Sequence, residues 1–88
     1  MSEGHDPDQA IGMVTHYFSH LSVAAISLTD TLRVGDRIHI SGHTTDLEQT
    51  VDSMEVEHQK VESAGAGDDV ALAVKDHVRD HDRIFREG

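Results

Sequence analysis

The sequence contains no cysteine and very few aromatic residues, namely one tyrosine and two phenylalanines. Without cysteine, neither a disulfide framework nor a thiolate metal site can form. No apolar run approaches the ~20 residues of a membrane-spanning helix, and residues 1–10 lack the basic and apolar blocks of a signal peptide. These absences favour a cytoplasmic protein that does not insert into a membrane.

Basic residues are also scarce, with seven Lys and Arg against seventeen Asp and Glu, which gives a net charge of −10. A free nucleic-acid-binding domain normally carries a basic patch, and this chain has none. The acidity has two interpretations: a surface that repels nucleic acid, or an adaptation to a halophilic host, where strong salt screens the repulsion between carboxylates. We favour the second.

The length of 88 residues suits one domain and is too short for two. We expect residues 1–10 to form a disordered acidic tail and residues 11–88 to form a single domain. Because aromatic side chains are so few, its core must be built mainly from Val, Ile, Leu and Ala.

Several short segments have the composition and alternation of β-strands. Residues 11–18 and 23–28 read as the two strands of a hairpin. Residues 37–41 alternate, with Ile38 and Ile40 on one face, and residues 69–75 alternate with Val70, Leu72 and Val74 on one face. Ile84 and Phe85 complete the set.

One turn pattern occurs three times, at residues 34–38, 66–70 and 80–84. Each copy has a residue suited to a positive φ, then Asp, then the start of a strand. Glycine adopts a positive φ without steric cost, and the side chain of Asp readily accepts a hydrogen bond from a nearby backbone N–H. Gly35 and Gly67 fill the first position, and His81 replaces them in the third copy.

Residues 47–58 are ambiguous. Their apolar side chains recur at helical spacing, and Thr45 with Glu48 would form a capping box, so the pattern alone leaves an α+β domain open. If the segment is instead extended, Val51 and Met54 have opposite parity. A β-bulge near Asp52 and Ser53 is then needed to turn both inward.

Three segments, 11–14, 32–40 and 64–70, resemble the second domain of elongation factor Tu and its relatives in order and spacing. The resemblance covers residues 11–86 and resolves the ambiguous segment toward strands. It implies an all-β fold, specifically a closed six-stranded antiparallel barrel. Residues 15–19 resemble more closely still the barrel appended to some collagenase-like peptidases, and also free-standing elongation-factor-like proteins. A closed barrel would also protect the edges of short strands.

The resemblance to elongation factors implies a partner associated with translation, either a protein or a ribonucleoprotein such as the ribosome or tRNA. On the family's tRNA-contacting strand, Glu55 matches, whereas Glu57 and His58 replace an aromatic residue and an arginine. On a strand, Tyr17 and Phe18 point to opposite faces, and one of them would be an exposed contact residue. We therefore predict that Glu55, His58, Tyr17 and His16 contact a partner.

Catalytic motifs are missing. The chain has no phosphate-binding Gly-x-x-x-x-Gly-Lys loop, and the glycines at residues 65 and 67 precede Asp68 and Asp69, which would repel phosphate. We therefore expect no GTP binding. No nucleophile-elbow motif occurs, so the sequence predicts a non-enzymatic binding module without a cofactor.

Histidine is the one enriched reactive residue, and six of the eight form pairs four residues apart: His16/His20, His39/His43 and His77/His81. Each pair spans a strand end and a turn, where that spacing does not guarantee that two imidazoles converge, and we predict no metal site. Two alternatives to the translation function stay open. One is an accessory barrel that acts in trans with a collagenase-like peptidase. The other is a His-based protein that binds metal or responds to pH.

Overall fold

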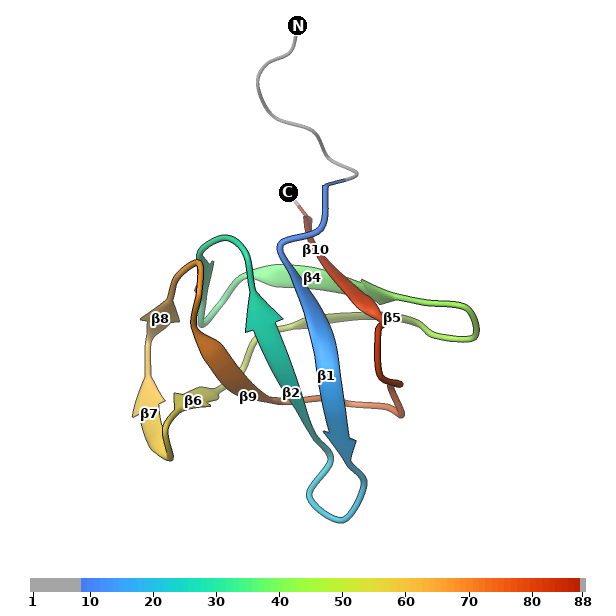
Figure 1. Ribbon diagram of the computed structural model, residues 1–88, viewed down its shortest axis with the longest axis horizontal. Coiled ribbons are helices and arrows are strands. Elements are labelled where there is room, and N and C mark those ends of the chain that lie inside the picture. Colours follow the sequence, from blue (N-terminus) through green and yellow to red (C-terminus); the bar gives the residue numbers. More distant parts are fainter. Residues whose placement is uncertain (1–8, 88) are drawn as a thin grey trace, which may run out of the picture.

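The computed structural model describes residues 9–87, and the secondary structure within them consists of ten β-strands (Figure 1). The strands are β1 (Gly12–Phe18), β2 (Val23–Leu28), β3 (Leu32–Arg33), β4 (Arg37–Ser41), β5 (Asp46–Thr50), β6 (Met54–Val56), β7 (Gln59–Val61), β8 (Ser63–Ala64), β9 (Asp69–Ala73) and β10 (Arg83–Glu87). The all-β prediction is confirmed. Residues 1–8 of the predicted acidic tail lie outside the described residues. Across residues 9–87, no helix has the length and apolar character needed to cross a membrane.

Eight strands form one curled antiparallel sheet in the order β5-β4-β10-β1-β2-β9-β6-β7, and β3 pairs with β8 in a separate ribbon. The sheet is open, because its outermost strands β5 and β7 do not pair with each other in the described part of the chain. The predicted closed six-stranded barrel is therefore wrong in strand number and in closure. The difference arises at residues 46–61, which place β5 at one edge of the sheet and β6 with β7 at the other.

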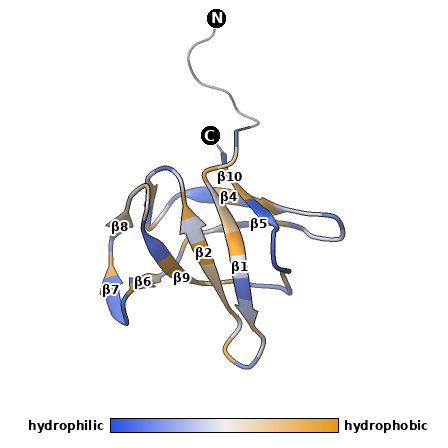
Figure 2. Cartoon of the chain, viewed as in Figure 1, coloured by the Kyte–Doolittle hydropathy of each residue, from blue (hydrophilic) through white to orange (hydrophobic). Residues whose placement is uncertain are grey.

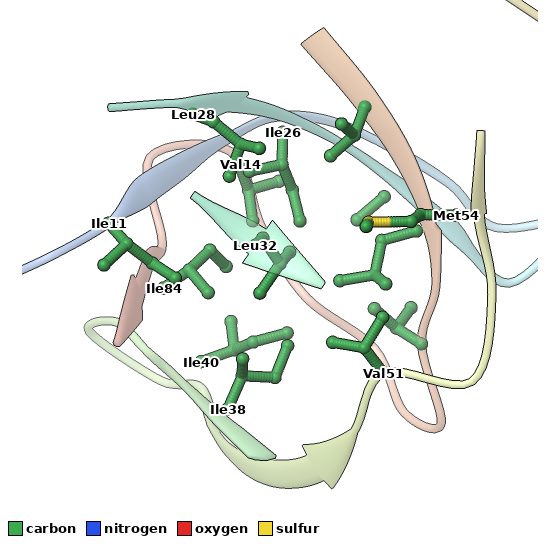
Figure 3. Close-up of a cluster of buried hydrophobic side chains, with 14 of the residues drawn as sticks. Ile11, Val14, Ile26, Leu28, Leu32, Ile38, Ile40, Val51, Met54 and Ile84 are labelled. Carbon is green, nitrogen blue, oxygen red and sulfur yellow. The ribbon is translucent and has the colours of Figure 1, made fainter. Parts of the chain in front are cut away.

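The core fills the inside of the curl, where side chains from both ends of the sheet meet (Figure 3). The predicted alternation is confirmed in β4 and β9, because Ile38, Ile40 and Leu72 are fully buried while their sequence neighbours are more exposed. Hydrophobic and hydrophilic residues follow one another along the strands (Figure 2). Burying one such aliphatic side chain contributes about 1.5–3 kcal/mol, so the sheet's inner face supplies most of the driving force for folding.

The three predicted turn repeats share one hydrogen-bond pattern. In each, an Asp carboxylate accepts a hydrogen bond from the backbone N–H three residues earlier: Arg33 to Asp36 (3.0 Å), Gly65 to Asp68 (2.9 Å) and Arg79 to Asp82 (2.8 Å). The residue before each Asp has a positive φ: Gly35 (99°), Gly67 (91°) and His81 (75°). The prediction that His81 adopts this conformation in the place of glycine is confirmed.

Each turn is also held against a buried residue that lies far from it in sequence. The Gly35 N–H donates to the Val51 carbonyl, and the Val51 N–H donates back to the Asp36 carbonyl, both at 2.8 Å. The same reciprocal pair joins the second turn to Leu28 and the third turn to Val14. The backbone therefore uses one device three times to fasten a turn onto the core.

Residues 47–58 form strands and a turn and contain no helix, so the helical alternative is wrong. Val51 and Met54 are both buried, each with 1% of its surface exposed. The predicted irregularity is present, but it is a break between strands at residues 51–53 and not a β-bulge within one strand. At this break the chain passes from one part of the sheet to another. Before it, β5 pairs with β4, and after it, β6 pairs with β7 and β9.

Gln49 links β5, the edge strand, to the chain that continues from β9. Its side chain is buried, with 2% of its surface exposed. The side-chain amide donates to the Ala73 carbonyl at 2.9 Å, and its oxygen accepts from the Lys75 N–H at 2.9 Å. One side chain thus satisfies two backbone groups that no neighbouring strand reaches, and it holds the curl together across the open side.

Candidate functional site

The outer face of β2 and β9 carries small side chains. Val23, Ala25 and Ser27 on β2 and Ala71 and Ala73 on β9 are all half-buried and face outward. Such side chains rise little above the backbone, so they leave a low, smooth strip in the middle of the sheet. The strip is bordered by β1 on one side and by β6 on the other.

A β-bulge in β1 determines which of its side chains border this strip. The pairing with β2 shifts between Val14 and His16, which leaves Thr15 as an extra residue. A bulge reverses the in–out order of the residues that follow it. Tyr17 consequently packs against the core, and His16 and Phe18 face outward. The prediction that Tyr17 and Phe18 point to opposite faces is confirmed.

The large hydrophobic side chains exposed within residues 9–87 all belong to the β1–β2 hairpin. Met13, Phe18 and Leu21 have 39%, 43% and 68% of their surface exposed. The His16 ring packs edge-on against Phe18, with 4.4 Å between ring centroids. The loop that carries Leu21 projects away from the other strands (Figure 1). We call this set the hairpin face: Met13, His16, Phe18, Leu21, Val23 and Ala25.

Two of the four predicted contact residues share the outer face. The strand registers align His16, Ala25, Ala71 and Glu55 in one row across β1, β2, β9 and β6. With strands about 4.8 Å apart, His16 and Glu55 lie about 14 Å from each other.

The other two predicted contact residues lie elsewhere. His58 is exposed in the β6–β7 turn, where Glu57 and His58 both have a positive φ. Tyr17 is turned toward His77, with 4.6 Å between ring centroids. The four residues therefore do not form one cluster, and partner contact by any of them stays a prediction.

The outer face at the edge of the sheet formed by β5, β4 and β10 is charged, and its charges are paired. Arg37 on β4 lies 3.9 Å from Glu48 on β5 and 3.7 Å from Glu87 on β10. His39 lies 2.5 Å from Asp46. We call Arg37, His39, Asp46, Glu48 and Glu87 the charged face. Its basic and acidic side chains form ion pairs with one another across β4, β5 and β10.

The histidines pair with residues that their spacing did not indicate. His39 contacts Asp46, His77 contacts Tyr17, and His16 contacts Phe18. His39, Glu48 and Glu87 do bring three potential metal ligands within 4.8 Å of one another. Arg37 is the ion-pair partner of both glutamates there, so we interpret the group as an ion-pair network. Sequence spacing missed this group because its members come from three different strands.

In sequence, the chain matches part of a protease and part of collagenases. It is 40% identical over 76 residues to an uncharacterized protease of Methanocaldococcus jannaschii. It is 37% identical over 78 residues to a collagenase of Porphyromonas gingivalis. The matches cover 85% and 86% of this chain, but the chain spans only about a fifth of the length of these relatives. No protein-family model matches the chain.

Solved structures agree on the fold. Two crystal structures of the C-terminal domain of a putative U32 peptidase from Geobacillus thermoleovorans superpose with TM-scores of 0.86 and 0.82. They cover 98% and 88% of this chain at 17% and 18% sequence identity. At that level of identity the likeness concerns the fold alone, and it shows the same small all-β domain.

These comparisons correct the predicted function. The translation-associated function is wrong, because the sequence relatives are a protease and collagenases. Contact with a ribosome- or tRNA-related partner stays a prediction. The Gly-Asp turns on which the elongation-factor resemblance depended have a structural role in this fold, where each fastens a turn to the core. The peptidase-associated alternative is the one that the comparisons support.

Proposed function

We propose that the chain is a non-catalytic accessory domain of a collagenase-like peptidase system, acting in trans with a peptidase subunit. The observation that carries this proposal is the 37–40% identity with a protease and a collagenase over nearly the whole described domain. Because the match covers only about a fifth of those relatives, four-fifths of each is available to hold the catalytic residues. The matched fifth then has a supporting role.

The use of the buried polar side chains agrees with a supporting role. Among residues 9–87, Gln49 and Asp82 are buried with 2% and 3% exposure, and both accept hydrogen bonds from backbone N–H groups. Acid–base catalysis requires a titratable group that is free to exchange a proton with a substrate. Gln49 has no titratable group, and Asp82 holds the backbone through one of its carboxylate oxygens.

The hairpin face is the proposed contact with the peptidase. It exposes Met13, Phe18 and Leu21 beside a smooth strip of small side chains. Aromatic residues and methionine are enriched at protein interfaces, where charged residues are depleted. In the longer relatives, the corresponding domain shares its chain with the rest of the peptidase, which is the natural occupant of such a face.

A binding experiment tests this proposal. The purified chain is titrated into a collagenase-like peptidase from the same source, at several salt concentrations up to molar KCl, and heat release is measured. We expect a saturable complex that persists in high salt, because an apolar contact is not screened. Two folded proteins that form no complex at any salt concentration would overturn the proposal.

A further inference from the structure

Two hollows meet at the end of the molecule where the 42–45 and 74–82 loops lie. One is lined by Thr44, Thr45, Asp46, Leu47, Asp76, His77 and Arg79. The other is lined by Tyr17, Ser19, His77, Val78, Arg79 and Asp80. His77 and Arg79, both in the 74–82 loop, line both hollows. We call the first of them the threonine hollow.

Thr45 is the residue of the threonine hollow whose side chain is not accounted for by the fold. Only 8% of its surface is exposed, and its backbone carbonyl accepts the Gly42 N–H at 2.9 Å. Its hydroxyl has no hydrogen-bond partner within residues 9–87. A buried hydroxyl without a partner costs free energy, and a ligand in the hollow would supply the missing partner.

Acidic side chains outnumber basic ones in the lining of the two hollows. Asp46, Asp76 and Arg79 line the threonine hollow, and Asp80 and Arg79 line the neighbouring one. One oxygen of Asp46 contacts His39, and one oxygen of Asp76 accepts the His77 N–H at 2.7 Å. Each carboxylate therefore keeps a second oxygen as an acceptor. Arg79 lies beside them, but in the described part of the chain it makes no ion pair within 4.0 Å of either.

We infer that the threonine hollow binds a basic side chain of an extended peptide. The free acceptors of Asp46 and Asp76 match the several N–H donors of a guanidinium or ammonium group. The Thr45 hydroxyl can form a hydrogen bond with the backbone of the peptide that carries this basic side chain. The Tyr17–His77 ring pair, 4.6 Å between centroids, provides a surface for the neighbouring peptide residues. The choice of a peptide as ligand rests on the proposed peptidase-associated function.

Fluorescence anisotropy with three labelled peptides tests this inference on the whole chain. The peptides have the same length and a glycine-rich sequence, and they differ only in one central residue: arginine, glutamine or glutamate. We expect the arginine peptide to bind most tightly and the glutamate peptide most weakly. Equal binding of the arginine and glutamate peptides would overturn the inference.

Two variants separate a specific site from general attraction to an acidic protein. Asp46→Asn should weaken binding of the arginine peptide about fivefold, as expected for one exposed charge pair worth about 1 kcal/mol. Asp69→Asn, an exposed change of the same charge on β9, is the matched control and should leave affinity within twofold. Equal losses in both variants would show that only net charge matters, and would reject the site.

Thr45→Val tests the hydroxyl without changing charge. Because the hydroxyl has no partner within residues 9–87, we expect an unchanged or higher melting temperature together with about fivefold weaker binding of the arginine peptide, the loss expected for one hydrogen bond. Unaltered peptide affinity would contradict the inference. A complex with the peptidase but no peptide binding would reject the hollow and retain the proposed function, and peptide binding without any complex would do the reverse.

Discussion

Two parts of the main sheet present opposite kinds of outer surface: the edge formed by β5, β4 and β10, and the centre formed by β1 and β2. At the charged face, Arg37 bridges two glutamates from the neighbouring strands, and His39 contacts Asp46. At the hairpin face, Met13, Phe18 and Leu21 are exposed with no larger side chains to cover them. The charged face therefore pairs its own charges, whereas the hairpin face leaves apolar surface in water. This difference is the reason that we propose the hairpin face as the contact with a partner.

Gln49 ties the edge strand β5 to the chain that continues from β9, and breaking that tie should have the largest effect. Gln49→Leu keeps the volume but leaves the Ala73 carbonyl and the Lys75 N–H without the side-chain partner that each now has. We expect a loss of about 3 kcal/mol in the free energy of unfolding, measured by urea denaturation. Gln59→Leu on the exposed edge strand β7 is the control. A loss no greater than the control's would show that the curl does not depend on this residue.

The role of the hairpin face is tested by removing its exposed side chains. The double variant Phe18→Ser and Leu21→Ser should weaken binding to the peptidase at least thirtyfold, which corresponds to about 2 kcal/mol for residues at the centre of an interface. The measurement is isothermal titration calorimetry, with circular dichroism to verify the fold. The control removes Arg37 and Glu48 from the charged face. If the control loses more affinity than the double variant, the assignment of the two faces is reversed.

The chain just after β4 and the turn just before β10 approach each other closely at Gly42 and Asp82. A Cβ atom on Gly42 would lie 1.8 Å from the Asp82 carboxylate, which is buried and accepts the Arg79 N–H. Gly42→Ala should therefore lower the free energy of unfolding by about 2 kcal/mol, the range for overpacking. Gly65→Ala is the matched control, because no atom lies within 4 Å of its Cβ position. Equal melting temperatures for the two variants would show that this close approach is not needed.

The ion pairs of the charged face should have the smallest effect. Glu48→Gln removes one partner of Arg37, and both side chains are about half exposed. We expect a loss of at most about 0.5 kcal/mol in the free energy of unfolding that disappears in 1 M salt, where the screening length is about 3 Å. A salt-independent loss above 1 kcal/mol would mean that the pair is structurally essential.

Local chemistry made much of the fold predictable from sequence. The turns at Gly35, Gly67 and His81 were found from residue type alone, because a residue suited to a positive φ followed by Asp is typical of a tight turn. The boundaries of β2 and β4 followed from their alternation. Long-range relations were not accessible. The open edge, the Gln49 link and the three-strand cluster at His39 all join residues that are distant in sequence.

The predicted contact residues show the same limit. His16 and Glu55 share a face only because the bulge at Thr15 reverses the order of β1, and nothing in the local sequence marks that bulge. Phe18 and Leu21 are the more exposed apolar residues, yet their exposure follows from the sheet order. The comparisons corrected the function for a related reason, since short Gly-Asp motifs report turns rather than partners.

Hydrogen exchange measured with and without the peptidase tests the central claim most directly. We predict slower amide exchange across residues 13–25 in the complex and unchanged exchange across residues 37–50. Slowing confined to residues 37–50, or no slowing in the hairpin when the peptidase is bound, would contradict the claim that the hairpin face is the contact surface.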